Sequence, residues 1–290
     1  MTARFIGSEE HKRLFCDSFL ETHRPFDPID IAWPRLGAQS LSRLKALPVW
    51  NEAVRTEAET ALKVQTLGAS EPDPLLARAI ALQGYEEGRH AALLRLLTSH
   101  YGIAVADFTT PHPPKDPVRA FLSTGYGECL DSFFAFGLFA IGLRSEYFPP
   151  ALTDIFDPIL QEEARHILFI VNWAAYLAAR TPVFVRPFWE LRRAGTIAAQ
   201  ILGHARDAMR VGGEESDSQE GFTMNAHEAF GDLSARAFLE LCLAENDRRL
   251  APYDARLLRP ALVPAAVRFV LRVLPRRPER PRPAPQGDPA

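Results

Sequence analysis

The stretch Glu86-Glu87-Gly88-Arg89-His90 decides the predicted fold, because a near copy returns as Glu162-Glu163-Ala164-Arg165-His166. Each copy contains Glu-x-x-His, with an acid before the Glu and an Arg before the His. Residues three apart share one face of a helix, so each copy directs a carboxylate and an imidazole the same way. Two such helices, with one Glu from each of two further helices, can hold two metal ions inside a helical bundle.

A single Glu-x-x-His is a weak signal, but its repetition is harder to attribute to chance. Both copies lie within long stretches of apolar periodicity, where an unpaired Glu or His would be costly to bury. A coincidental pair of surface or core residues is the alternative. The metal site is the favoured hypothesis, and its first four predicted ligands are Glu87, His90, Glu163 and His166.

A further carboxylate ligand is predicted on a helix from Pro48 to about Leu67, which we expect to break at residues 68–72. At 100° per residue, five side chains form one arc of this helix: Trp50, Val54, Ala58, Ala61 and Gln65. Glu57 falls inside the arc, whereas Glu59 falls on the opposite, polar side. The predicted break lies near the midpoint between Glu57 and Glu87, so an antiparallel hairpin would bring these two residues to one level.

The last carboxylate ligand is expected within residues 117–144. This stretch is apolar nearly all round and therefore typical of a buried helix. Glu128 and Asp131 are the acids in its middle. We assign Glu128 as the ligand, with Asp131 as the alternative ligand or as an acceptor for a ligand His. A buried Glu128 paired with an Arg is the competing interpretation, because buried charges are usually paired.

The order Glu, Glu-x-x-His, Glu, Glu-x-x-His over residues 48–180 resembles the ferritin-like di-iron carboxylate superfamily. The fuller acid-Glu-x-Arg-His form resembles the branch with the ribonucleotide reductase small subunit and the bacterial di-iron monooxygenases. The resemblance implies that four residues orient the ligand imidazoles: Glu86, Arg89, Glu162 and Arg165. It also implies two Fe ions, with Fe/Mn or Mn/Mn as alternatives.

Two positions depart from these relatives. The reductase subunit keeps a radical Tyr where this chain has Leu94, and some di-iron N-oxygenases carry an extra His where it has Ile159. We therefore expect neither a tyrosyl radical at that place nor a seventh ligand. Neither difference removes oxygen activation.

Composition limits the other classes of protein. The chain of 290 residues is 47% hydrophobic and 24% charged, with a net charge of −3, so no basic field favours nucleic acid. Its three Cys have no metal or disulfide spacing, and no signal peptide or uncharged apolar run of spanning length is visible. We expect a cytoplasmic protein.

The predicted class is all-α: a ferritin-like four-helix bundle with additional N- and C-terminal helices. Residues 1–47 are expected to form a helix and an extended arm, and 48–180 the bundle. Further helices are predicted within 181–274, near 184–211, 225–230 and 234–250, and the Pro/Arg-rich residues 275–290 are expected to be disordered. Pro158 would begin the last bundle helix or kink it. We expect residues 260–274 to dock on the bundle; contact with a membrane surface is the less favoured alternative.

The expected function is that of an O2-dependent non-haem di-iron oxidoreductase, an oxygenase or hydroxylase, acting on a small apolar organic substrate. Electrons could come from a redox-partner protein, and the chain is expected to be a homodimer or a monomer. Five Phe are candidates for an apolar cavity beside the metals, although ordinary core packing explains each as well: Phe133, Phe134, Phe136, Phe139 and Phe169. The alternatives are a ferroxidase, peroxidase or iron-storage protein, and a metal-free helical binding or scaffold protein.

Overall fold

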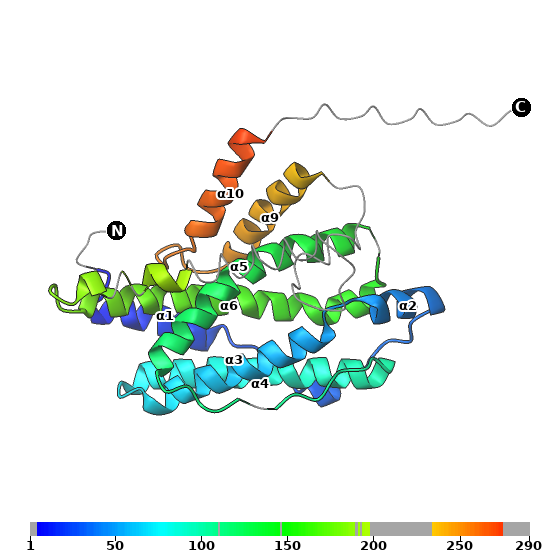
Figure 1. Cartoon of the computed structure of the whole chain (residues 1–290), viewed down its shortest axis with the longest axis horizontal. Coiled ribbons are helices and arrows are strands. Elements are labelled where there is room, and N and C mark those ends of the chain that lie inside the picture. Colours follow the sequence, from blue (N-terminus) through cyan, green and yellow to red (C-terminus); the bar gives the residue numbers. More distant parts are fainter. Residues whose placement is uncertain are drawn as a thin grey trace, which may run out of the picture.

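The computed structural model describes residues 5–109, 111–145, 147–188, 191, 193–197 and 234–274. Across these residues the chain forms helices and no strands, as Figure 1 shows. The predicted all-α class is therefore confirmed for the part of the chain that the structure describes.

Helices α3 (Trp50–Ser70) and α4 (Pro74–Tyr101) form an antiparallel pair along one side of the molecule (Figure 1). The Asp73 carboxylate caps α4, and Gly102, with φ of 62°, ends it in the left-handed conformation. The predicted break at residues 68–72 contains the end of α3 at Ser70, although the helix continues past Leu67. A Cβ atom on Gly68 would lie 3.3 Å from the Ala81 backbone nitrogen, so this glycine allows the close approach of α3 and α4.

Helices α5 (Pro117–Arg144) and α6 (Pro150–Arg180) complete the four segments that were predicted to carry ligands. Helix α5 contacts both α3 and α6. Pro158 lies inside α6 and does not begin it. By length and composition alone α5 could cross a membrane, but half of its apolar window is buried inside the protein, as in core helices of soluble proteins.

Helix α1 (Glu9–Glu21) contacts both α4 and α6, and the Ser8 side chain caps it. A short 3-10 helix, η1 (Pro28–Asp30), follows within the arm. The sequence prediction missed α2 (Ala38–Ala46). This short helix depends on tertiary contacts: Leu44 is buried, and its carbonyl accepts a hydrogen bond from the Trp50 indole at 2.9 Å.

Helices α9 (Ala235–Leu250) and α10 (Leu262–Val273) agree with two predicted C-terminal helices. Helix α9 packs on α5, and α10 packs on α9 (Figure 1). The predicted segment 184–211 is described only in part, and the predicted helix at 225–230 and the tail 275–290 lie outside the described residues.

The phenylalanines that were candidates for a cavity pack mainly into the core. Phe136 and Phe169 belong to the main core formed largely by α1, α4, α5 and α6, and Phe133 is buried with Phe238 between α5 and α9. Beside Phe169 and Arg165 the free volume is about 10 Å³, enough for one water molecule. Ordinary core packing therefore explains these three residues.

Candidate metal centre

Three helices bring four predicted ligands together. Atoms from Glu57 on α3, Glu87 and His90 on α4, and Glu163 on α6 all lie within 4.8 Å of one another. His166 joins them from α6: its Nδ1 atom lies 2.9 Å from Glu87 Oε1. The two imidazole rings are 5.7 Å apart between centroids, close to parallel at 30°.

The two motif carboxylates each face both imidazoles. Glu163 oxygens lie 3.0 Å from His90 Nδ1 and 3.7 Å from His166 Nδ1. Glu87 oxygens lie 4.0 Å and 2.9 Å from the same two nitrogens. These carboxylates therefore lie between the imidazoles, where a ligand shared by two cations would have to be.

The acid that hydrogen-bonds the Nε2 atom of each imidazole belongs to the other motif. His90 Nε2 lies 2.9 Å from Glu162, and His166 Nε2 lies 2.9 Å from Glu86. When each Nε2 donates its proton to an acid, each Nδ1 keeps a lone pair that points toward the carboxylate cluster. These two hydrogen bonds fix the orientation of both rings and link α4 to α6.

Two buried arginines hold these acids in place. Arg89 donates to both Glu162 oxygens at 2.7 and 2.8 Å, and Arg165 hydrogen-bonds Glu86. Burial alone would raise the pKa of Glu86, but its hydrogen bonds from His166 and Arg165 hold that pKa well below its ordinary value. Glu86 thus remains an ionised acceptor for the imidazole of His166.

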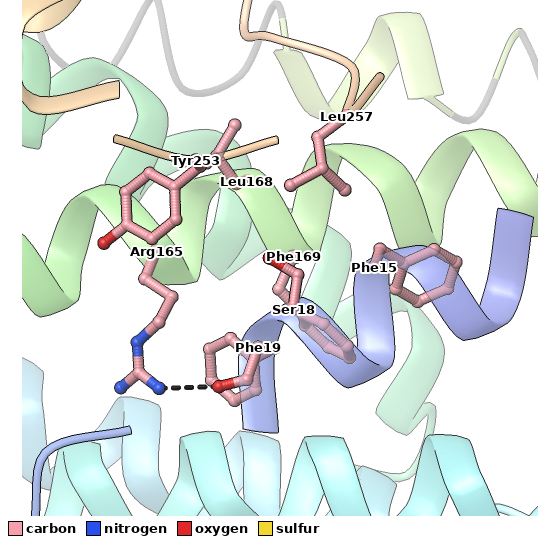
Figure 2. A pocket seen from close by; sticks show the side chains of 8 residues that line it. All are labelled: Phe15, Ser18, Phe19, Arg165, Leu168, Phe169, Tyr253 and Leu257. Atoms are coloured by element: carbon pink, nitrogen blue, oxygen red, sulfur yellow. Dashed lines mark hydrogen bonds between the residues drawn. The ribbon is translucent and has the colours of Figure 1, made fainter. Parts of the chain in front are cut away.

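The N-terminal segment contacts both arginines, Arg89 and Arg165, on the side away from the carboxylate cluster. Arg165 donates to the Phe19 carbonyl at 2.8 Å and lies 4.5 Å from the Phe19 ring centroid, as Figure 2 shows for the hydrogen bond. Arg89 donates to the Arg24 carbonyl at 3.2 Å and stacks on the Phe26 ring at 3.9 Å. The end of α1 and the following arm therefore fix the orientation of both guanidinium groups.

His23 is the supporting residue that the sequence did not reveal. It follows the end of α1, and its Nδ1 atom hydrogen-bonds Glu86. His23, Glu86 and Glu162 also form a second group with atoms within 4.8 Å of one another. Arginine and histidine hydrogen bonds already occupy the two acids, so we interpret His23 as part of this support. The contact spans 63 residues, which local patterns do not report.

Glu128 reaches the centre from α5. Both of its carboxylate oxygens are buried and have no hydrogen-bond partner among the described residues. Burial, together with the charges of Glu87 and Glu163, raises its pKa well above the ordinary value. The competing interpretation, a Glu128 paired with an Arg, is therefore wrong within the described residues. Asp131 lies half-buried one turn further along α5, and its role as the alternative ligand stays a prediction.

The donor set fits cations. Both Glu128 oxygens are buried without a hydrogen-bond partner in the described structure, and the buried Nδ1 atoms of His90 and His166 face carboxylate oxygens at 3.0 and 2.9 Å. Burial raises the pKa of Glu57 to about 8, and the neighbouring carboxylates raise the pKa of both imidazoles against the opposing effect of burial. Buried carboxylates gathered in this way, one of them without a hydrogen bond, are costly unless bound ions or protons neutralise them.

One side of the centre is more exposed to solvent than the others. The Glu57 side chain is 25% exposed and Glu163 14%, whereas Glu87 is 2% exposed. Ions and small molecules can therefore approach most directly past Glu57, from the side of α3.

No protein-family model, curated protein or solved structure matches this chain. The assignment of the centre therefore depends on its own residues and their geometry.

Proposed function

We propose that the chain is a ferritin-like binuclear metal protein that acts as an O2-dependent oxidoreductase. The single observation that carries the proposal is a buried cluster of carboxylates and imidazoles, in which both Glu128 oxygens have no hydrogen-bond partner among the described residues. Glu57, Glu87, His90 and Glu163 supply atoms within 4.8 Å of one another, and His166 Nδ1 lies 2.9 Å from Glu87. The order of ligands along α3, α4, α5 and α6 supports the ferritin-like assignment of the bundle.

Four carboxylates and two imidazoles suit Fe or Mn, because these oxygen and nitrogen donors favour hard and borderline ions. The four ionised carboxylates carry −4, which balances two divalent cations, so the loaded centre would be near neutral inside an apolar bundle. Two iron ions bound there would supply redox chemistry with O2.

The residues around the ions have separate tasks. Glu162 and Glu86 hold the imidazoles in the tautomer that leaves Nδ1 free to bind metal. Arg89 and Arg165 orient these acids through hydrogen bonds. Glu57, on the more exposed side, is the ligand with most room to change position when a small organic substrate arrives. The packed aromatic side chains of α1 and α6 exclude water from the opposite side.

One observation favours a second candidate, a ferroxidase or peroxidase that needs no organic pocket. The free volume beside Phe169 and Arg165 is about 10 Å³, too small for an organic substrate (Figure 2). A metal-free scaffold is disfavoured, because it would leave the buried Glu128 carboxylate without a partner among the described residues.

The test loads the metal-free protein anaerobically with Fe(II) and then exposes it to O2, with optical and Mössbauer spectroscopy. We expect about two irons per chain, oxidised as an interacting pair, and turnover of a compound from a small-metabolite pool. Iron oxidation without turnover, together with a mineral core in a hollow shell, would favour storage. Wild-type protein that binds no iron would overturn the proposal.

A further inference from the structure

Helix α10 has a docked face and a second apolar face that nothing in the described structure covers. The docked face is formed by Pro264, Val267 and Leu271, of which the first two are buried; Val267 and Leu271 pack beside Phe238 of α9. Through this face α10 packs on α9 and also contacts α5. Docking uses only part of the helix surface.

The second face is large and apolar. Leu262, Phe269, Val270 and Val273 are 58%, 63%, 40% and 67% exposed. At 100° per residue these side chains fall on one side of α10, away from the docked face. Figure 1 shows α10 beside α9 on the outer side of the molecule, far from α3 and α4. Clustered exposed apolar residues on one helix indicate an interaction surface.

Positive charge accompanies this face. Arg268 and Arg272 lie on its flank, and Arg268 is 53% exposed, with Asp247 3.9 Å away. The sequence that follows has two acids, Glu279 and Asp288, and four arginines: Arg276, Arg277, Arg280 and Arg282. The segment is strongly basic within a chain whose net charge is −3.

We propose that α10 binds the surface of an anionic lipid bilayer, with Leu262, Phe269, Val270 and Val273 inserted at the headgroup boundary. An apolar stripe flanked by arginines is the composition of helices that lie in the membrane interface, and neighbouring basic residues attract anionic lipids. A second copy of the chain would bring two basic segments together. Nucleic acid would use the arginines but leave the apolar stripe exposed. The inference does not depend on the metal centre.

The experiment measures flotation of the full-length protein with vesicles of neutral phosphatidylcholine, or of phosphatidylcholine with phosphatidylglycerol. We expect binding to the anionic vesicles that weakens as salt rises, and little binding to the neutral ones. The double variant Phe269→Ser/Val273→Ser should lose binding by on the order of tenfold or more. Arg268→Gln/Arg272→Gln should weaken binding to anionic vesicles alone.

The matched control is Phe188→Ser, because Phe188 is 73% exposed but lies outside α10. It should bind as the wild type does, and circular dichroism melting should show that all variants are folded. Equal binding to neutral and anionic vesicles, no binding to either, or full binding by the Phe269→Ser/Val273→Ser variant would each overturn the proposal. A concentration-dependent dimer that this double variant abolishes would instead assign the face to a second copy.

Discussion

At the scale of single residues, the cross-paired acids and imidazoles explain why the motif is longer than Glu-x-x-His. Glu86 supports His166 and Glu162 supports His90, at 2.9 Å in both cases. The acid preceding each ligand Glu and the Arg preceding each ligand His therefore serve the opposite motif. A single copy of the motif would lack the acid that supports its own imidazole, and this accounts for the presence of two copies.

Glu57 offers a matched test of a ligand. Glu57→Gln should weaken metal binding by at least the order of 10- to 100-fold, the loss typical even of residues that only support ligands. Glu59→Gln on the same helix should bind metal normally, because Glu59 is near Lys63, 3.6 Å away, in an ion pair at the surface. Metal affinity is measured by competition with a chelator. Equal losses in the two variants would contradict the assignment.

Metal binding should release protons. The pKa of Glu57 in the metal-free protein is raised to about 8, so at pH 7 this carboxyl is mostly protonated and must ionise to bind a cation. Affinity should therefore increase as pH rises toward and through 8, and fewer protons should leave Glu57 above that pH. Titration calorimetry at pH 7 in two buffers of different ionisation enthalpy measures the release. Identical binding heats in both buffers would rule out this coupling.

At the scale of helices, close approach between α5 and α6 depends on Gly125. A Cβ atom there would lie 2.3 Å from Ile170 Cγ2, so Gly125→Ala should lower the free energy of unfolding by about 1–3 kcal/mol. Gly88→Ala is the control, since its Cβ would have ordinary contacts at 3.8 and 3.9 Å and the second motif already has Ala164 there. Urea denaturation measures both. A Gly125→Ala protein as stable as wild type would show that the two helices are spaced differently.

The sequence predicted elements well where local chemistry sets them. Asp73-Pro74 and Gly102 mark the ends of α4, and the apolar arc of α3 identified Glu57 as inward-facing. Helix α2 and the contact of His23 with Glu86 were missed because both depend on residues distant in the chain: Leu44 of α2 packs in a cluster with Leu97 and Leu152. Helical periodicity predicts the face on which a side chain lies but not the residue that it contacts. It therefore could not predict that the acid of each motif hydrogen-bonds the imidazole of the other motif.

At the scale of the whole molecule, bound ions should stabilise the fold, because they neutralise acids that four helices bring together. One ion at a hundred times its dissociation constant contributes about 2.7 kcal/mol. The loaded protein should therefore melt roughly 5–10 °C above the metal-free form for each such ion. Differential scanning calorimetry with and without chelator checks this. An unchanged melting temperature would mean that the carboxylates do not bind ions in the folded protein.

The N-terminal arm, the bundle and the C-terminal helices contribute unequally to the centre. The end of α1 and the arm contact the centre through His23, which hydrogen-bonds Glu86. The carbonyls of Phe19 and Arg24 accept hydrogen bonds from the two buried arginines. Helix α9 packs on the outer side of α5, and α10 lies beyond it. The proposed lipid surface and the proposed metal centre thus lie on separate parts of the molecule, and each can be lost without the other.

The most direct test is anomalous diffraction from crystals soaked in Mn(II). We expect two peaks per chain, bounded by the six predicted ligands: Glu57, Glu87, His90, Glu128, Glu163 and His166. In crystals of Glu163→Gln both peaks should weaken or vanish, because this carboxylate faces both imidazoles. A wild-type crystal that shows no peak among these side chains, or peaks only at surface acids, would contradict the account.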